Sequence, residues 1–222
     1  MTDHTPARVV LRPLATPLPL GFLALGVATL AFASFQLRWI AASEAHTVAL
    51  AVLVLTVPLQ LVACVMGFLA RDPVAATGMG ILSGTWAAAC FATLTSPPGT
   101  SSAGLGVVLL CSAACLLVPA VGARAKAVPA AVIAVSAARF ALTGIAEIDG
   151  GRVWMDLAGW VGVVLAAIAF YAALALELEG TESRTVLPLG RTGAARRAVD
   201  DATRSPTSRT SPASAASSDP AG

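Results

Sequence analysis

One arginine stands inside an otherwise uncharged stretch of this chain. Arg139 lies within the apolar run of residues 128–145. A charge at bilayer depth costs at least about 2.5–3.5 kcal/mol on insertion scales, so this side chain should face a wet cavity or a partner. Ser136, three residues earlier, lies on the same helix face, so if one of these side chains lines a cavity, both do. An ion pair of Arg139 with Glu147 or Asp156, or a side chain reaching the membrane surface, explains the charge equally well.

Two glutamines are the other polar groups in or near apolar runs. Gln60 lies within the second run and Gln36 at the end of the first. An amide in hydrocarbon must find a hydrogen-bond partner, because leaving it without one is costly. We therefore expect Gln60 to face a pore or to bond a neighbouring helix.

The residue types that most enzymes use are scarce here. The two histidines, His4 and His46, lie in a tail and at a helix end, and no nucleotide loop, metal cluster or nucleophilic triad is recognisable. The net charge of +2, without a basic patch, argues against nucleic acid. The sequence predicts no enzyme, no cofactor and no metal site. Four cysteines fall in apolar runs, where we interpret them as small packing residues: Cys64, Cys90, Cys111 and Cys115.

The elements that must position these residues are membrane helices. Of the 222 residues, 57% are hydrophobic and 12% are charged, about half the charged fraction of a soluble domain. Six apolar runs are each long enough to cross a bilayer core about 30 Å thick. The sequence thus predicts an all-α integral membrane bundle of six transmembrane helices. The expected spans are residues 20–37, 46–69 (with Pro58 inside), 74–94, 103–121, 128–145 and 157–176, with an acidic loop at 147–156.

The basic residues predict how the chain crosses the membrane. We divide it into an N-terminal tail (1–15), the six-helix domain (16–190) and a polar C-terminal tail (191–222) too poor in apolar residues to order itself. Cytoplasmic loops carry an excess of Lys and Arg, so both termini should be cytoplasmic. One side collects Arg8, Arg12, Arg71, Arg124, Lys126, Arg184, Arg191, Arg196 and Arg197, and the other only Arg38 and Arg152.

Two short motifs flank the six apolar runs. The first opens the first span as Thr16-Pro17-Leu18-Pro19-Leu20-Gly21-Phe22. The second has two parts, Ala158-Gly159-Trp160-Val161-Gly162 and Arg184-Thr185-Val186-Leu187-Pro188-Leu189-Gly190. In this order and spacing they resemble the acetate uptake transporter family, of the succinate–acetate permease type. The family's first motif begins N-P-A-P-L-G-L, from which Thr16, Leu18 and Phe22 depart.

The resemblance implies a bacterial inner-membrane transporter or channel for acetate and related small monocarboxylates, with succinate as a further candidate. It also implies a ring-like homo-oligomer, a hexamer in the family. The runner-up functions are a membrane scaffold that transports nothing and a channel for small neutral solutes such as ammonia. No acidic residue lies deep inside a span, which favours passive conduction over proton coupling.

The resemblance also assigns a substrate pathway. Family members conduct through a narrow pore in each protomer, and alignment places its constriction on Leu25, Leu82 and Ser136, although Leu82 replaces an aromatic residue. Gln60 and Tyr171 match a family glutamine and tyrosine. Arg139 stands where the family has an apolar residue, and ordinary core packing explains Leu25 and Leu82 equally well.

Overall fold

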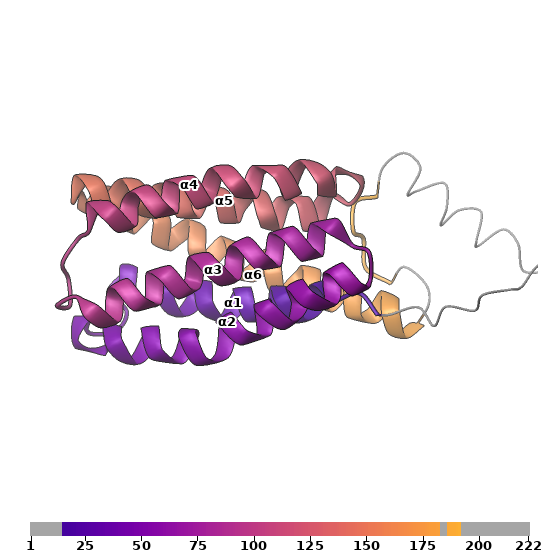
Figure 1. The fold of residues 1–222 in the computed structure, drawn as a ribbon, viewed down its shortest axis with the longest axis horizontal. Helices are drawn as coiled ribbons and strands as arrows, with labels where there is room; N and C mark the ends of the chain where they lie inside the picture. The colour runs from indigo at the N-terminus through magenta and orange to yellow at the C-terminus, as the bar shows by residue number, and fades with distance from the viewer. Residues whose placement is uncertain (1–14, 183–185, 192–222) are drawn as a thin grey trace, which may run out of the picture.

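The computed structural model describes residues 15–182 and 186–191, which form a bundle of long helices (Figure 1). All six main helices are long and apolar enough to cross a membrane, so the predicted membrane bundle is confirmed. Residues 1–14 and 192–222, nearly all of the two predicted tails, lie outside the described residues. The helices are α1 (Leu18–Gln36), α2 (Ala45–Leu69), α3 (Pro73–Thr95), α4 (Ala103–Gly122), α5 (Ala127–Asp149) and α6 (Arg152–Glu182), with 3-10 turns η1 (Ala42–Glu44) and η2 (Ala123–Ala125).

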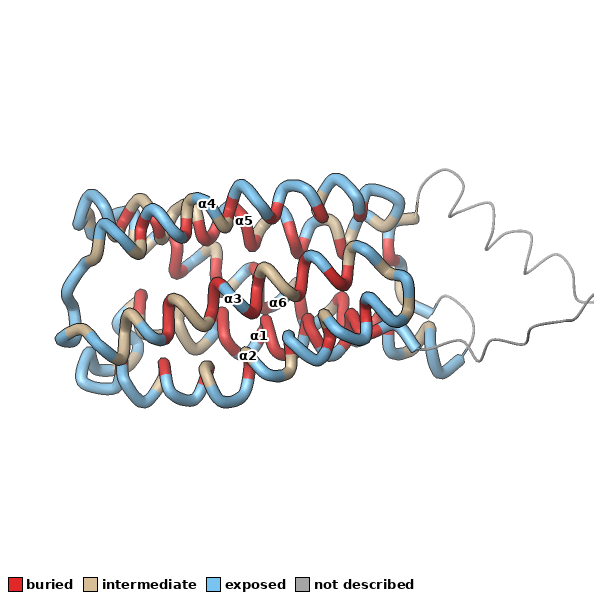
Figure 2. Tube along the Cα trace, viewed as in Figure 1, coloured by how far each residue is buried: buried red, intermediate tan, exposed pale blue. Residues whose placement is uncertain are grey.

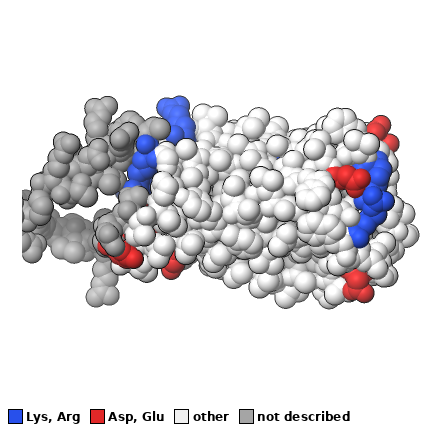
Figure 3. All heavy atoms as spheres, turned by 180° about the vertical axis from the view of Figure 1, so that it is seen from behind, with Lys and Arg blue, Asp and Glu red and all other residues white. Residues whose placement is uncertain are grey.

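Short connections make successive helices antiparallel, so the bundle has two distinct ends (Figure 1). The terminal end holds the start of α1, the end of α6 and the connections at 70–72 and 123–126. The cavity end holds the connections at 37–44, 96–102 and 150–151. Figure 3 shows Lys, Arg, Asp and Glu at these two ends, with an uncharged band between them. That distribution suits a protein whose waist lies in hydrocarbon.

The helices differ in how far their neighbours enclose them. α1 packs chiefly on α6 and α2, α2 on α3, and α4 on α5. α1 and α3 are the most enclosed, whereas most residues of α2 and α4 are exposed (Figure 2). Val54 on α2 is 67% exposed and Val118 on α4 is 73% exposed. Exposed faces of this kind require lipid or another protein, which agrees with the membrane assignment.

Helix α1 ends in a tight turn that uses an arginine in place of glycine. Arg38 adopts φ +62, its N–H donates to the Phe35 carbonyl at 3.0 Å, and the Trp39 N–H donates to the Ser34 carbonyl at 2.8 Å. This is a Schellman cap, whose left-handed position glycine usually fills. A left-handed residue with a Cβ costs about 1–2 kcal/mol. The strain at Arg38 therefore calls for a role of its side chain.

The expected acidic loop at 147–156 is wrong. α5 continues to Asp149 and α6 begins at Arg152, so the connection consists of two glycines. Gly150 adopts φ +69 and ends α5, which glycine does without steric cost. A helix can project from the bilayer into water, where charged side chains are tolerated. The acidic residues therefore did not mark the end of the helix. Glu147 and Asp156 consequently stand on helices, where they face the neighbouring elements.

Candidate functional site

The cavity end of the bundle contains two adjoining cavities. The wide cavity, of about 380 Å³, lies among the α1–α2, α3–α4 and α5–α6 connections. The narrow cavity, of about 60 Å³, lies deeper, between α1, α3, α4, α5 and α6. Six residues line both of them: Phe35, Gln36, Thr93, Leu105, Glu147 and Met155. The two cavities therefore form one funnel that narrows toward the middle of the bundle.

Aromatic rings and Arg139 surround the deep part of the funnel. Phe32, Trp86 and Phe140 come from α1, α3 and α5, and all three line the narrow cavity. The ring centroids of Phe32 and Trp86 are 5.2 Å apart, and those of Trp86 and Phe140 are 5.5 Å apart. The Arg139 guanidinium carbon lies 5.3 Å from the Trp86 ring centroid. The narrow cavity thus combines an apolar wall with one cation.

Arg139 is held by neutral groups and not by an acid. Its Nη2 donates to the Gln36 side-chain oxygen at 3.2 Å and to the Thr29 carbonyl at 3.4 Å. It is 2% exposed, so it does not reach the membrane surface. The face of Trp86 contributes up to about 2 kcal/mol to a desolvated cation. This is comparable with the insertion cost of about 2.5–3.5 kcal/mol.

The two acids expected as partners of Arg139 are engaged elsewhere. The Glu147 carboxylate accepts the Ser102 N–H at 2.8 Å, which holds the loop before α4. Asp156 lies 2.6 Å from the nearest Arg152 nitrogen and 3.7 Å from that of Arg38. The ion-pair and surface alternatives for Arg139 are therefore wrong. Of the three hypotheses for this residue, only a side chain that lines a cavity agrees with the structure.

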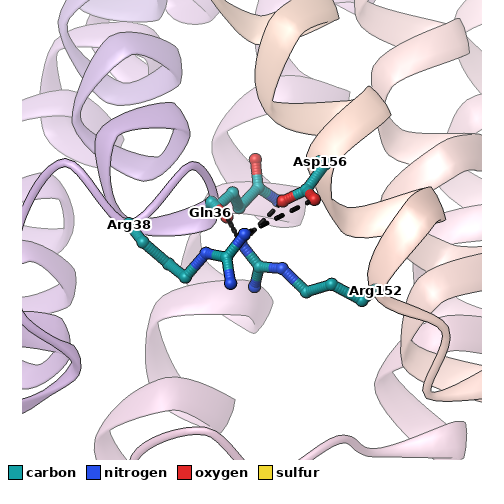
Figure 4. A network of polar contacts seen from close by, with 4 residues as sticks. All are labelled: Gln36, Arg38, Arg152 and Asp156. Carbon is teal, nitrogen blue, oxygen red and sulfur yellow. Dashed lines mark hydrogen bonds and ion pairs between the residues drawn. The ribbon is translucent and has the colours of Figure 1, made fainter.

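Gln36 connects the mouth of the funnel to its floor. Its side-chain nitrogen donates to Thr143 Oγ1 at 3.3 Å while its side-chain oxygen accepts from Arg139. Its main-chain carbonyl, left free at the end of α1, accepts from Arg152 at 2.5 Å (Figure 4). The sequence predicted that Gln60 faces a pore or bonds a neighbouring helix, and it carried no such prediction for Gln36. Gln36 instead carries the contact that positions the buried cation.

The three predicted constriction residues lie beyond the funnel, toward the terminal end. Leu25 and Leu82 are 0% exposed and Ser136 is 1% exposed. The Ser136 hydroxyl donates to the Val132 carbonyl of its own helix at 2.7 Å. None of the three lines either cavity. Each is part of the closed interior, about one helical turn or more from Arg139, Phe32 or Trp86 along its helix.

Gln60 is buried in this closed region without a hydrogen bond. It is 0% exposed, and neither atom of its amide has a partner. The Thr29 hydroxyl and the Trp86 indole N–H are in the same condition. Arg139 Nε is a fourth such group, although buried polar atoms of native proteins are normally paired.

The second motif closes the terminal end of the bundle. The Leu189 and Gly190 carbonyls accept the N–H groups of Val128 and Ala127, at 3.2 and 3.0 Å. These are donors that the first turn of α5 cannot satisfy internally. Tyr171 on α6 donates its hydroxyl to the Pro188 carbonyl at 2.9 Å. Tyr171 lines neither cavity; it holds this segment. Arg184 lies outside the described residues.

The remaining motif residues shape helix contacts. Pro17 and Pro19 stand at the entry of α1, where the first N–H groups lack partners in any case. A Cβ at Gly159 would come within 2.7 Å of Leu37, so the glycine permits close approach of α6 to the end of α1. Gly21 likewise permits close approach of α1 to Met79 on α3. Leu20 and Trp160 face outward, at 36% and 56% exposure, and Trp160 packs edge-on against Trp39.

Metal or thiol chemistry gains no support from the side chains. Within residues 15–182 and 186–191, no three His, Cys, Asp or Glu side chains gather as metal ligands. Cys90 is buried, Cys64 is half-buried, and Cys111 and Cys115 face outward on α4, all with free thiols. His46 contacts the Ser96 carbonyl at 3.1 Å.

Sequence reasoning missed Phe32, Phe140 and Thr143, because aromatic and hydroxyl residues in apolar runs look like ordinary packing.

Comparison with known proteins supports the fold. No protein-family model matches the chain, and no curated protein matches it. Among solved structures, the bacterial acetate channel SatP superposes with a TM-score of 0.69. The alignment covers 80% of this chain and 99% of that one, at 24% sequence identity. At that identity the likeness shows that the two chains share a fold.

Proposed function

We propose that this chain is a membrane channel for acetate and related small monocarboxylates. The observation that carries the proposal is a buried guanidinium on the floor of a funnel that opens at one end of the bundle. A carboxylate must lose water to enter an apolar passage, and an opposite charge offsets that cost. The fold shared with an acetate channel supports the same reading.

The proposed route follows the bundle axis. The anion enters the wide cavity, reaches Arg139 in the narrow one, and then meets the layer formed by Leu25, Leu82 and Ser136. This layer is closed in the structure, so conduction requires a small outward movement of its side chains. Gln60, whose amide is unpaired, offers the next polar contact toward the terminal end. Acidic residues of the described helices lie near helix ends, which favours passive conduction.

We infer two further properties of the assembled protein. The outward apolar faces of α2 and α4 suit contacts with other copies of the chain as well as lipid, so we propose a homo-oligomer. The basic residues at the terminal end, among them Arg71, Arg124 and Lys126, favour a cytoplasmic location for that end. Both termini would then lie in the cytoplasm of a bacterial cell.

Radiolabelled acetate uptake into proteoliposomes tests the function. We expect saturable uptake that propionate and other short monocarboxylates compete for. Arg139→Leu should lower uptake most at low acetate, because the guanidinium raises the local anion concentration. Arg139→Lys should keep part of the uptake, because the charge matters more than the shape of the group. Arg124→Gln, which removes a cation at the opposite end, is the matched control and should behave as wild type.

The outcomes separate the competing functions. Assembled protein that passes no solute at all would favour the membrane scaffold. Passage of ammonia or another neutral solute without acetate would favour the neutral-solute channel. Unchanged acetate uptake by a stably folded Arg139→Leu protein would refute the role assigned to the guanidinium.

A further inference from the structure

Arg139 carries a positive charge that no acidic side chain among the described residues balances with an ion pair. Within residues 15–182 and 186–191, the ion pairs involve Arg38, Arg152 and Arg191, and none of them includes Arg139. The hydrogen bonds of Arg139 go to one amide oxygen and one main-chain carbonyl, both neutral. A fully enclosed cation without a counter-charge is unfavourable in a protein interior.

We propose that the narrow cavity binds one small monovalent anion, whose charge compensates Arg139 inside the bundle. The inference follows from the buried charge and the adjoining cavity. It stands whether or not the chain conducts acetate. A halide and a short carboxylate share the required chemistry, namely one negative charge and little bulk.

The size of the narrow cavity selects the ligand class. Its volume of about 60 Å³ is several times the roughly 10–15 Å³ that one water needs. It is well below the roughly 300–1,000 Å³ of sites for drug-sized ligands. The cavity therefore admits one small ion, and its phenyl and leucine walls tolerate a methyl or ethyl group but bond no second charge.

The guanidinium has donors left for such an anion. Only Nη2 of Arg139 makes hydrogen bonds, and Nε is buried without a partner. Nε packs toward Gly162, where a Cβ would come within 2.6 Å of it, so Nη1 is the nitrogen best able to donate into the cavity. The Trp86 ring lines the same cavity, and its indole N–H is also buried and unpaired.

Access to the site comes through the wide cavity, which is lined near its mouth by two arginines. Arg38 and Arg152 line that cavity and converge on Asp156 beside the end of α1 (Figure 4). Glu147 lines the same cavity, so the two cations face two carboxylates and the mouth has no net positive charge. The Glu147 carboxylate accepts a hydrogen bond from the Ser102 N–H. The charge of Arg139, deeper in the funnel, is therefore what attracts an anion into the bundle.

Calorimetric titration of the full chain in lipid nanodiscs tests the site. Sodium chloride, sodium bromide and sodium acetate are titrated separately into a sodium gluconate background, because gluconate is too bulky for the cavity. We expect one site per chain and mutual competition among the three anions. Arg139→Gln should weaken binding about thirtyfold or more, as removal of one partner of a buried charge pair does. Arg124→Gln, the control, should leave the affinity unchanged.

A second measurement needs no variant. Crystals of the wild-type chain grown in sodium bromide should show anomalous bromine density between Arg139 and Trp86. Absence of that density, or equal anion affinity in the folded Arg139→Gln protein, would overturn the site. Anion binding without acetate flux would overturn the channel alone, and acetate flux without saturable anion binding would overturn the site alone.

Discussion

Replacing Gly162 by alanine should destabilise the protein through Arg139. Gly162 lies in the first half of α6, and a Cβ there would come within 2.6 Å of Arg139 Nε and 3.1 Å of Ala33 Cβ. Real Cβ atoms do not approach other atoms as closely as 2.6 Å. Either the guanidinium leaves its place over Trp86 or α6 moves away from α1 and α5. Overpacking of this kind typically costs about 1–3 kcal/mol.

The matched control for this substitution is on the same helix. A Cβ at Gly180 meets nothing within 4 Å, so Gly180→Ala should raise stability by up to about 0.5–1 kcal/mol, the helix preference of alanine over glycine. The unfolding temperature of each purified variant in one detergent is the measurement. We expect Gly162→Ala to fall below wild type and Gly180→Ala to equal or exceed it.

A double variant shows whether Arg139 is the cause. Removing the guanidinium in Arg139→Leu frees the space beside Gly162, so Gly162→Ala should cost less in that background than in wild type. We expect a coupling of at least about 1 kcal/mol, within the range for residues in direct contact. If Gly162→Ala costs the same in both backgrounds, Arg139 Nε does not pack against α6, and the placement of the buried cation is refuted.

Three further predictions concern the two ends of the bundle. Arg38→Gly should raise the unfolding temperature, because glycine relieves a left-handed backbone that costs an arginine about 1–2 kcal/mol. The lost contact with Asp156, exposed and 3.7 Å long, is worth at most about 1 kcal/mol. A lower unfolding temperature would contradict this prediction. Tyr171→Phe removes the hydrogen bond to the Pro188 carbonyl and should lower the stability by about 0.5–1.5 kcal/mol in thermal unfolding. An unaltered stability would show that this bond does not hold the segment that contains Pro188. Of two reporters fused after Gly222, the one that works only in the cytoplasm should be active and the one that works only in the periplasm should be inactive. The opposite result would reverse the proposed orientation.

The number and kind of helices could be read from the sequence because a bilayer leaves few alternatives. Backbone groups in hydrocarbon must be satisfied within the segment, so an uncharged run of about twenty residues becomes a helix. The same logic fails at residues 147–156, where the charged residues do not mark a loop. Charged residues also extend helices into water, and only Gly150, with its left-handed backbone, ended α5.

The sequence by itself determined that Arg139 is exceptional, because a charge in an apolar run is costly wherever the helices lie. Its partners came only from the tertiary structure. Thr29 and Gln36 are 110 and 103 residues away along the chain, and Trp86 reaches it from α3. Which side chains meet between helices depends on how each helix is rotated and how closely it packs. Local periodicity does not encode that rotation when every face of a helix is apolar.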